Sequence, residues 1–175
     1  MSAASGGATP GSAASARGDG RRSSPGGEGI PGGATTITMP HRVGFHETDA
    51  MGIVHHANYL RFCEDARVVW LETHDKGYPE WIAMGLNFAV TRVELDYRAS
   101  SAFDDVLEVT TWLEWVRGAS LAMAYRIERQ GTLILTGRTE HASVNEAGRV
   151  RRIPREDRAR LASRALPETS TGVPD

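Results

Sequence analysis

One segment of this chain has the apolar spacing of a long helix, and most of the chain after that segment alternates with the period of a strand. Between residues 57 and 76 the apolar side chains recur every three or four positions, which places them on one face of a helix. Gly77 and Pro79 are expected to end this helix. A chain with one long amphipathic helix and several half-apolar strands buries both only by packing the helix against a sheet.

Alternating polarity predicts one strand before the helix and four after it. The first covers residues 35–45, where β-branched side chains predominate and Pro40 favours an edge position. The others lie near residues 92–98, 107–115, 121–128 and 132–145, and a short helix is expected over residues 155–161. The expected fold is therefore α+β, with a curved antiparallel sheet of about five strands wrapped around one long central helix, the shape called a hotdog fold.

Composition divides the chain into a folded centre and two tails. Residues 1–34 are rich in Gly, Ser, Ala and Pro and have almost no large apolar side chain to offset the entropy of ordering. The end of the chain, with Leu-Pro-Glu-Thr-Ser-Thr-Gly, is similarly polar and short. We expect a disordered leader over residues 1–34, one domain over residues 35–160 and a C-terminal tail over residues 161–175.

The overall composition excludes several classes of protein. With 175 residues, 40% of them hydrophobic, and a formal net charge of −2, the chain gives no electrostatic reason to expect nucleic-acid binding. No run of about eighteen apolar residues predicts membrane insertion, and the first residues do not form an apolar secretion signal. The single cysteine, Cys63, falls on the apolar face of the predicted helix, so a buried packing role is expected. A cytoplasmic location follows as a prediction.

The segment ETDAMGIVHHANY, residues 47–59, brings a carboxylate and two imidazoles to the start of the predicted helix. The free N–H groups of a helix N-terminus can polarise a carbonyl group or hold a developing oxyanion. A carboxylate beside them, here Asp49, can attack the carbonyl carbon or activate a water molecule. The segment therefore favours carbonyl chemistry, with Asp49 as the reacting side chain and His55 and His56 beside it.

Two simpler interpretations compete with this one. An isolated aspartate in a loop is ordinarily a turn or capping residue. A metal site would use Glu47, Asp49, His55 and His56, but adjacent histidines point in different directions and no HExxH helix is present. No metal and no cofactor are therefore expected.

The pattern resembles a known family, the hotdog-fold acyl-CoA thioesterases of the 4-hydroxybenzoyl-CoA thioesterase type, including the Tol-Pal-associated branch. The resemblance spans about residues 36–154. Its most specific part is TDAxGxVxHANY at residues 48–59, followed by Phe62, Glu64, Ala66 and Arg67 in the helix. Weaker agreement comes from Asp96-Tyr97, Phe103-Asp104-Asp105, Gly118-x-Ser120 and the closing Gly148 to Pro154.

This resemblance implies an enzyme that hydrolyses an acyl-CoA substrate to a free acid and CoA. Asp49 would be the catalytic carboxylate, as nucleophile or as general base, and the amide of His56 would polarise the thioester carbonyl. The family also implies a homodimer or homotetramer whose active sites lie at the subunit interface. Phe45 stands where the Tol-Pal branch often has tyrosine, and His55 replaces a residue that is often aromatic, so the acyl group stays open.

Further residues are candidates for substrate binding. Some of them lie at the start of the helix, and one lies on its exposed side, from which a long side chain could reach the site of a second copy. The others form a predicted turn whose arginine and backbone N–H groups are candidates for binding the CoA phosphates. These candidates are His55, Asn58, Tyr59, Glu64, Arg117, Gly118 and Ser120. Asn58 also fits a helix cap, Tyr59 a core residue and Arg117 a solvated surface charge.

Two other functions stay open from the sequence. The first is an enoyl-thioester hydratase or dehydratase on the same fold, whose pattern Asp-x-x-Asn-Pro-x-His is not matched by the residues between Asp49 and His56. The second is a non-catalytic module that binds acyl-CoA, which would be expected to lose the carboxylate that Asp49 retains. An acyl-CoA thioesterase is the expected function, since the fold alone does not decide between these.

Overall fold

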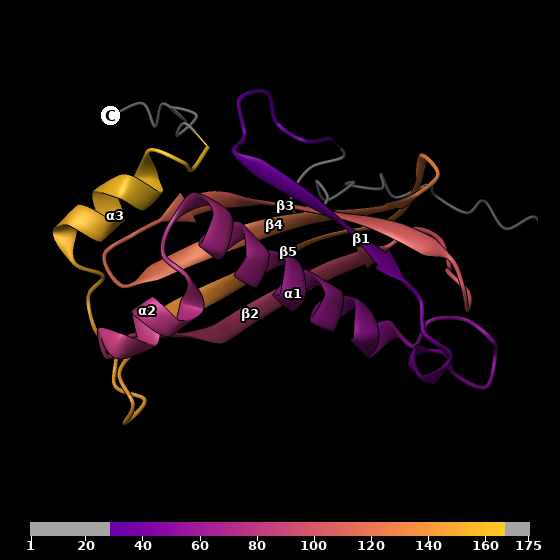
Figure 1. Ribbon diagram of the computed structural model, residues 1–175, viewed down its shortest axis with the longest axis horizontal. Coiled ribbons are helices and arrows are strands. Elements are labelled where there is room, and N and C mark those ends of the chain that lie inside the picture. The colour runs from indigo at the N-terminus through magenta and orange to yellow at the C-terminus, as the bar shows by residue number, and fades with distance from the viewer. Residues whose placement is uncertain (1–28, 167–175) are drawn as a thin grey trace, which may run out of the picture.

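A computed structural model describes residues 29–166 of the chain (Figure 1). Most of the predicted leader, residues 1–34, and of the predicted tail, residues 161–175, lies outside this range. Within it, no helix is long and apolar enough to cross a bilayer. In chain order the elements are β1 (Thr36–Arg42), the 3₁₀ turn η1 (Phe45–Glu47), α1 (His56–His74), α2 (Tyr78–Ala83), β2 (Asn87–Tyr97), β3 (Val106–Val116), β4 (Ser120–Arg129), β5 (Thr132–Val144) and α3 (Arg155–Ala162).

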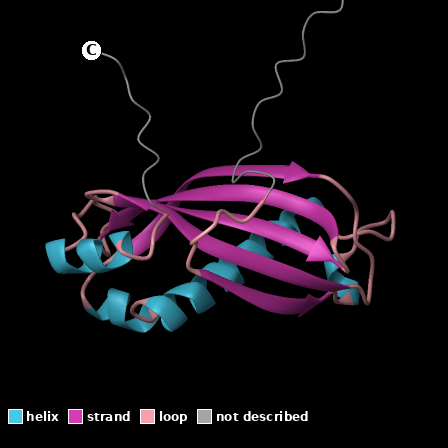
Figure 2. Cartoon of the chain, turned by 90° about the horizontal axis from the view of Figure 1, so that it is seen from above, coloured by secondary structure: helices cyan, strands magenta, loops and turns pink. Residues whose placement is uncertain are grey.

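The strands form one antiparallel sheet in the order β1-β3-β4-β5-β2, so β1 and β2 are its edges. Pro40 lies in edge strand β1, opposite Glu108 of β3, where a missing N–H group is tolerated. The long helix α1 runs along one face of the sheet, and α2 and α3 both lie at one end of it (Figures 1 and 2). This arrangement confirms the predicted α+β hotdog fold.

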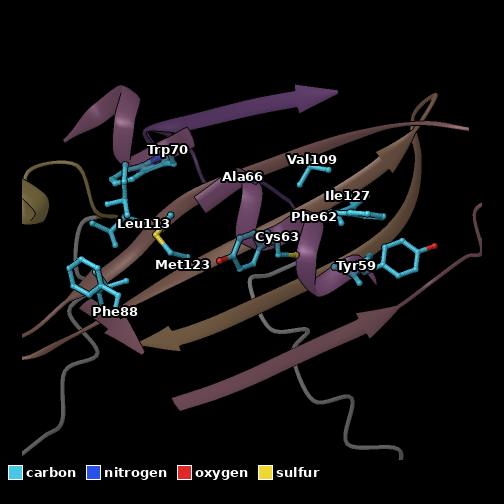
Figure 3. Packing of buried hydrophobic residues seen from close by; sticks show 14 of the residues in the cluster. Tyr59, Phe62, Cys63, Ala66, Trp70, Phe88, Val109, Leu113, Met123 and Ile127 are labelled. Carbon is cyan, nitrogen blue, oxygen red and sulfur yellow. The ribbon is translucent and has the colours of Figure 1, made fainter. Parts of the chain in front are cut away.

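Helix α1 buries the face that its sequence period marks as apolar. Tyr59, Cys63, Ala66 and Trp70 are at most 3% exposed. Figure 3 shows them against apolar side chains of the sheet, among them Val109, Leu113, Met123 and Ile127. Each large side chain buried in this way contributes roughly 1.5–3 kcal/mol. The prediction for Cys63 is confirmed, and burial raises the pKa of its thiol, so the sulfur stays protonated.

The connection from α1 to β2 differs from the prediction, because it contains a second short helix. Helix α1 ends at His74, and Gly77 is the N-terminal cap of α2 rather than the end of α1. Pro79 lies in the first turn of α2, where its missing N–H group costs no helical hydrogen bond. Trp81 of α2 is fully buried with its ring edge-on to Phe88, so α2 closes one end of the core.

Two buried carboxylates and two partly exposed cations fasten α3 to the end of α1. The carboxylate of Asp157 accepts from Lys76 and Arg160, and Arg160 also donates to Asp75. Burial favours the protonated acid, but the bonds from Lys76 and Arg160 lower the pKa of Asp157 below its ordinary value. Leu161 is fully buried in the core, so ordered packing extends just past the predicted boundary at residue 160.

Replacing Asp157 with asparagine is expected to lower the free energy of unfolding by about 1–2 kcal/mol at neutral pH. Lys76 and Arg160 lose a shared carboxylate, but both are partly in water and Arg160 keeps Asp75. The pKa of Asp157 is lower in the folded state, so its contribution is present above the ordinary carboxyl pKa and is lost as pH falls through the folded-state value. Urea unfolding across pH measures this. The two stability curves should converge in acid, and a constant gap would contradict the assignment.

Candidate active site

The loop between β1 and α1 is folded back on itself and held to the segment before β3. The N–H group of Asp49 donates to the carbonyl of Ile53 at 2.9 Å. The N–H group of Val54 donates to the carbonyl of Ser101 at 2.8 Å. These backbone bonds fix the loop at the end of the sheet, so the side chains it carries have defined positions.

Asp49 is half-buried in a tight turn of this loop. Its Oδ1 accepts a hydrogen bond from the N–H group of Met51 at 2.8 Å, and its carbonyl accepts from Gly52 at 2.9 Å. Gly52 has a φ of 73°, in the left-handed region that favours glycine. One carboxylate oxygen therefore orients the side chain, while the other takes no part in the turn.

Replacing Gly52 with alanine is expected to cost about 1 kcal/mol of stability, because a Cβ atom is strained at this φ. No atom lies within 4 Å of the added Cβ, so backbone strain is the sole cause. A shift of the turn moves Asp49, and we expect kcat to fall by roughly tenfold. Thermal unfolding and steady-state kinetics measure the two effects. Unchanged kcat in a destabilised variant would show that the turn does not position the carboxylate.

The first residues of α1 lie directly beside this turn. His55 is the N-terminal cap, and its Nδ1 accepts from the N–H group of Ala57 at 3.3 Å. His56 is the first helical residue, so its own N–H group has no acceptor within the helix. Both imidazoles are exposed, with ring centroids 4.2 Å apart. Within residues 29–166 the N–H group of His56 donates to no backbone acceptor, and a donor of this kind at the helix start is the group that carbonyl chemistry requires.

Asn58 has a different structural role from the helix cap considered from the sequence. Its Nδ2 donates to the carbonyl of Glu47 at 2.7 Å, and the same carbonyl accepts from the N–H group of His55 at 2.9 Å. The side chain thus ties the start of α1 to the loop that carries Asp49. His55 caps the helix instead, because its ring reaches the N–H group two residues later.

Glu47 is a residue that sequence reasoning considers only as a metal ligand. Its carboxylate accepts from the N–H group of Gly44 at 2.8 Å and lies 2.9 Å from Nε2 of His41. Partial burial opposes ionisation, but the bonds from His41 and Gly44 lower the pKa of Glu47. Within residues 29–166, no three side chains of the metal-binding types are grouped to hold an ion. Glu47 instead links β1 to the loop.

A pocket of about 320 Å³ opens beside the start of α1. Tyr59, which is 3% exposed, and Tyr97 of β2 form an aromatic wall with ring centroids 5.7 Å apart. The phenol of Tyr97 donates to the carbonyl of His56 at 2.9 Å. Burial, followed by the proximity of Cys63 and Tyr59, raises the pKa of Tyr97, so this donor stays protonated. The pocket is lined by Ile53, Val54, His56, Tyr59, Tyr97, Arg98, Ala99 and Ser100.

The remaining predicted site residues lie elsewhere in the chain's fold. Strand β3 is 11 residues long, so its ends are roughly 35 Å apart. The Asp49 loop lies at one end, and the turn with Arg117, Gly118 and Ser120 lies at the other (Figure 1). Arg117 is exposed and stacks 4.4 Å over the ring of Trp115. A single chain therefore does not bring this turn to Asp49.

Glu64 lies two helical turns beyond His56, roughly 12 Å along the axis. Its side chain is 63% exposed, as the sequence pattern predicts, and its Oε1 lies 3.4 Å from Nη2 of Arg67. The described chain thus gathers Asp49, His55, His56, Asn58 and Tyr59 at one place, and leaves Glu64 on a neighbouring part of α1.

The fold and this loop define the class of the protein: the chain belongs to the thioesterase-like superfamily, whose family model matches residues 43–166. The acyl-CoA thioesterase YbgC of Haemophilus influenzae is 33% identical over 126 residues, which cover 70% of this chain and 92% of that protein. The acyl-CoA thioester hydrolase YbgC of Escherichia coli O6:H1 is 37% identical over 93 residues, 53% of this chain and 69% of that protein.

Solved structures agree with this assignment. A Thermus thermophilus protein has a TM-score of 0.70 at 35% identity and covers 75% of this chain and 99% of its own length. A gentisyl-coenzyme A thioesterase has a TM-score of 0.66 at 25% identity and covers 72% of this chain and 100% of its own. The thioesterase family predicted from the sequence is therefore confirmed.

Proposed function

We propose that the chain is an acyl-CoA thioesterase, which splits an acyl-CoA with water into a free acid and CoA. The observation that carries this proposal is the oriented carboxylate of Asp49 in the loop that leads into the free amide of His56. The names of the YbgC relatives support the same substrate class. The cytoplasmic location and the independence from a cofactor stay predictions.

In the proposed reaction, the N–H group of His56 donates to the thioester oxygen and stabilises the negative charge that develops there. Asp49 either attacks the carbonyl carbon, forming an anhydride that water then opens, or takes a proton from an attacking water molecule. The carbon–sulfur bond breaks, and the sulfur leaves with the bonding electrons and takes up a proton as the CoA thiol. The acyl group leaves as the acid.

We further propose that two copies pair along the edge strand β2. An apolar strip on this strand consists of Val90, Val93 and Tyr97, which are 51%, 40% and 47% exposed. Their partners on β5 face the side of the sheet on which α1 lies, so these three side chains face that side too. Helix α1 packs mainly over β1 and β3 and meets the strip at Tyr97, whose ring faces Tyr59, so much of the strip stays exposed. A second copy of the strip would cover it and would also pair the open backbone of the edge.

This pairing accounts for the separation of the predicted site residues. Two β2 strands related by a two-fold axis run antiparallel, so opposite ends of the two copies become neighbours. The β3–β4 turn of one copy then lies toward the end that carries the Asp49 loop of the other. Arg117 and the backbone of Gly118 and Ser120 would there meet the phosphates of CoA.

The test is steady-state release of CoA thiol from acetyl-, hexanoyl-, palmitoyl-, benzoyl- and hydroxybenzoyl-CoA by the purified chain. Hydrolysis of at least one of them is expected, and the preferred member identifies the acyl class. Measurable binding of acyl-CoA without turnover would contradict the proposal and favour a binding module. Hydration of an enoyl-CoA without thiol release would favour the hydratase alternative.

A further inference from the structure

A second cavity lies between α1 and the sheet, apart from the pocket at the helix start. Its volume is about 70 Å³, and none of its lining residues is shared with the larger pocket. A cavity of roughly 10–15 Å³ already holds one water molecule, so this space admits a small polar group of several heavy atoms. It is lined by Leu60, Glu64, Arg67, Val90, Tyr125, Thr139 and His141, of which Val90 also belongs to the strip proposed to contact a second copy.

Arg67 contributes a buried positive charge to this cavity. Its residue is 4% exposed, and its Nη1 has no hydrogen-bond partner among residues 29–166. Its Nη2 reaches only Glu64, at 3.4 Å, and the Glu64 side chain is largely in water. The ring of Tyr78 lies 5.4 Å from the guanidinium carbon, and its hydroxyl bonds to the backbone of Phe88 instead. A buried guanidinium of this kind is stabilised by a further acceptor.

His141 supplies a second unpaired nitrogen. The residue is 1% exposed, and its Nε2 lies 2.7 Å from Oγ1 of Thr139, which lies 2.8 Å from the phenol oxygen of Tyr125. If the buried phenol donates to Thr139, the threonine hydroxyl donates to Nε2, and the ring proton then sits on Nδ1. Nδ1 has no hydrogen-bond partner within the described range.

The charge of the cavity follows from these groups. Burial lowers the pKa of His141 to about 4, and the charge of Arg67 lowers it too. The backbone carbonyl of Phe88 interacts with the ring and raises the pKa, although it does not meet normal hydrogen-bond geometry with Nδ1. At neutral pH the imidazole is therefore uncharged, and Arg67 alone supplies the buried charge. The cavity presents the positive charge and the unpaired Nη1 group of Arg67, and in the tautomer described above Nδ1 of His141 is a second donor. Leu60 and Val90 are apolar neighbours, and the carboxylate of Glu64 pairs with the other guanidinium nitrogen.

We propose that this cavity binds a carboxylate group, with Arg67 as its charged partner and His141 as a second donor. A carboxylate supplies two acceptor oxygens and the negative charge, whereas a methyl group would leave both nitrogens unpaired. Glu64 already pairs with Nη2 of Arg67 at 3.4 Å, so an incoming carboxylate meets Nη1, which has no partner among residues 29–166.

Two sources of a carboxylate fit this chemistry. His56, Leu60 and Glu64 follow one another at intervals of four on one face of α1, and Arg67 lies roughly 16 Å along the axis from His56. The far end of a long acyl group that carries a terminal carboxylate could therefore reach the cavity, an interpretation that rests on the proposed function. The other source is a free carboxylic acid.

The first measurement compares kcat/KM for acyl-CoAs that differ only at the far end: hexanoyl- with adipoyl-CoA, decanoyl- with sebacoyl-CoA, and myristoyl- with tetradecanedioyl-CoA. For the length that reaches the cavity, we expect the carboxylate form to be preferred by about tenfold or more. Arg67→Met should reduce this ratio to about one, since methionine is unbranched and uncharged. Arg61→Met, at an exposed arginine of the same helix, is the matched control and should keep the ratio.

The second measurement needs no turnover. Addition of sodium decanedioate or sodium acetate, followed by ¹H–¹⁵N spectra of the His141 ring, should shift the Nδ1 signal in the wild type and not in Arg67→Met. His141→Leu keeps Arg67 and should weaken carboxylate binding, which calorimetric titration measures. This variant tests the site if Arg67→Met does not fold. Binding of the free acids without any preference among the acyl-CoAs identifies the free acid as the ligand.

The proposal is overturned if neither the ratio nor the ring signal responds to a carboxylate. Loss of dimer stability in Arg67→Met without such a response would also overturn it, because Arg67 would then pair with a carboxylate of a second copy. Failure of the proposed thioesterase function gives a different result, because no methyl-ended substrate would then be hydrolysed. The binding measurement would still show whether the cavity takes a carboxylate.

Discussion

Replacing Asp49 with asparagine is expected to lower kcat for thioester hydrolysis by about a hundredfold or more. A carboxamide neither attacks the carbonyl carbon at a useful rate nor accepts a proton from water. The side-chain oxygen of asparagine can still accept the N–H group of Met51, so the turn keeps its geometry. Steady-state release of CoA thiol at saturating substrate, from the wild type and the variant, measures the effect.

The matched control is Asp65→Asn, which removes an exposed aspartate from the outer side of α1. It should keep both kcat and KM, and both variants should unfold at about the wild-type temperature. Equal kcat in Asp49→Asn and the wild type would remove this carboxylate from the chemistry. A rise in KM with unchanged kcat would give Asp49 a role in substrate binding only.

The fold is largely predictable from the sequence because its two kinds of element differ in period. Helix α1 rests on one face of the sheet, so its apolar positions, such as Phe62 and Ala66, recur at helical spacing. Strand β4 pairs on both sides, and its core-facing Met123 and Tyr125 alternate with small or charged residues. The period therefore identifies which face of each element meets the core.

Local signals are less decisive at the ends of helices. Gly77 and Pro79 are typical of a helix end, yet the same pair also fits a helix start, and α2 begins there. The buried Trp81 decides between the two, because it needs a place in the core. That need is a tertiary effect, which a pattern of neighbouring residues does not contain.

The candidate site, too, is only partly predictable from the sequence. Asp49, His55 and His56 are predictable together because a single loop carries them. Tyr97 is not predictable as their neighbour, since it belongs to β2 and meets the carbonyl of His56 only after the sheet forms. The chemistry of CoA makes Arg117 a candidate for a phosphate contact, which stays a prediction, and no periodicity shows that its turn lies at the far end of the sheet from Asp49.

Replacing Val93 with aspartate is expected to convert the proposed dimer to a monomer and to abolish most of the thioesterase activity. Val93 is 40% exposed in edge strand β2, near the middle of the apolar strip. Across a two-fold axis the new carboxylates would lie close together in a surface that excludes water, where like charges cost several kcal/mol. Sedimentation velocity measures the assembly, and thiol release at the same protein concentration measures the activity.

Val106→Asp is the matched control, because Val106 is 51% exposed but lies in β3, which pairs with β1 at the opposite edge of the sheet. It should stay dimeric and active. A monomeric Val93→Asp variant with full activity would show that one chain forms the whole site, which would contradict the contribution of the β3–β4 turn from a second copy. Partial recovery at high protein concentration would instead connect activity directly to assembly, because mass action restores the dimer.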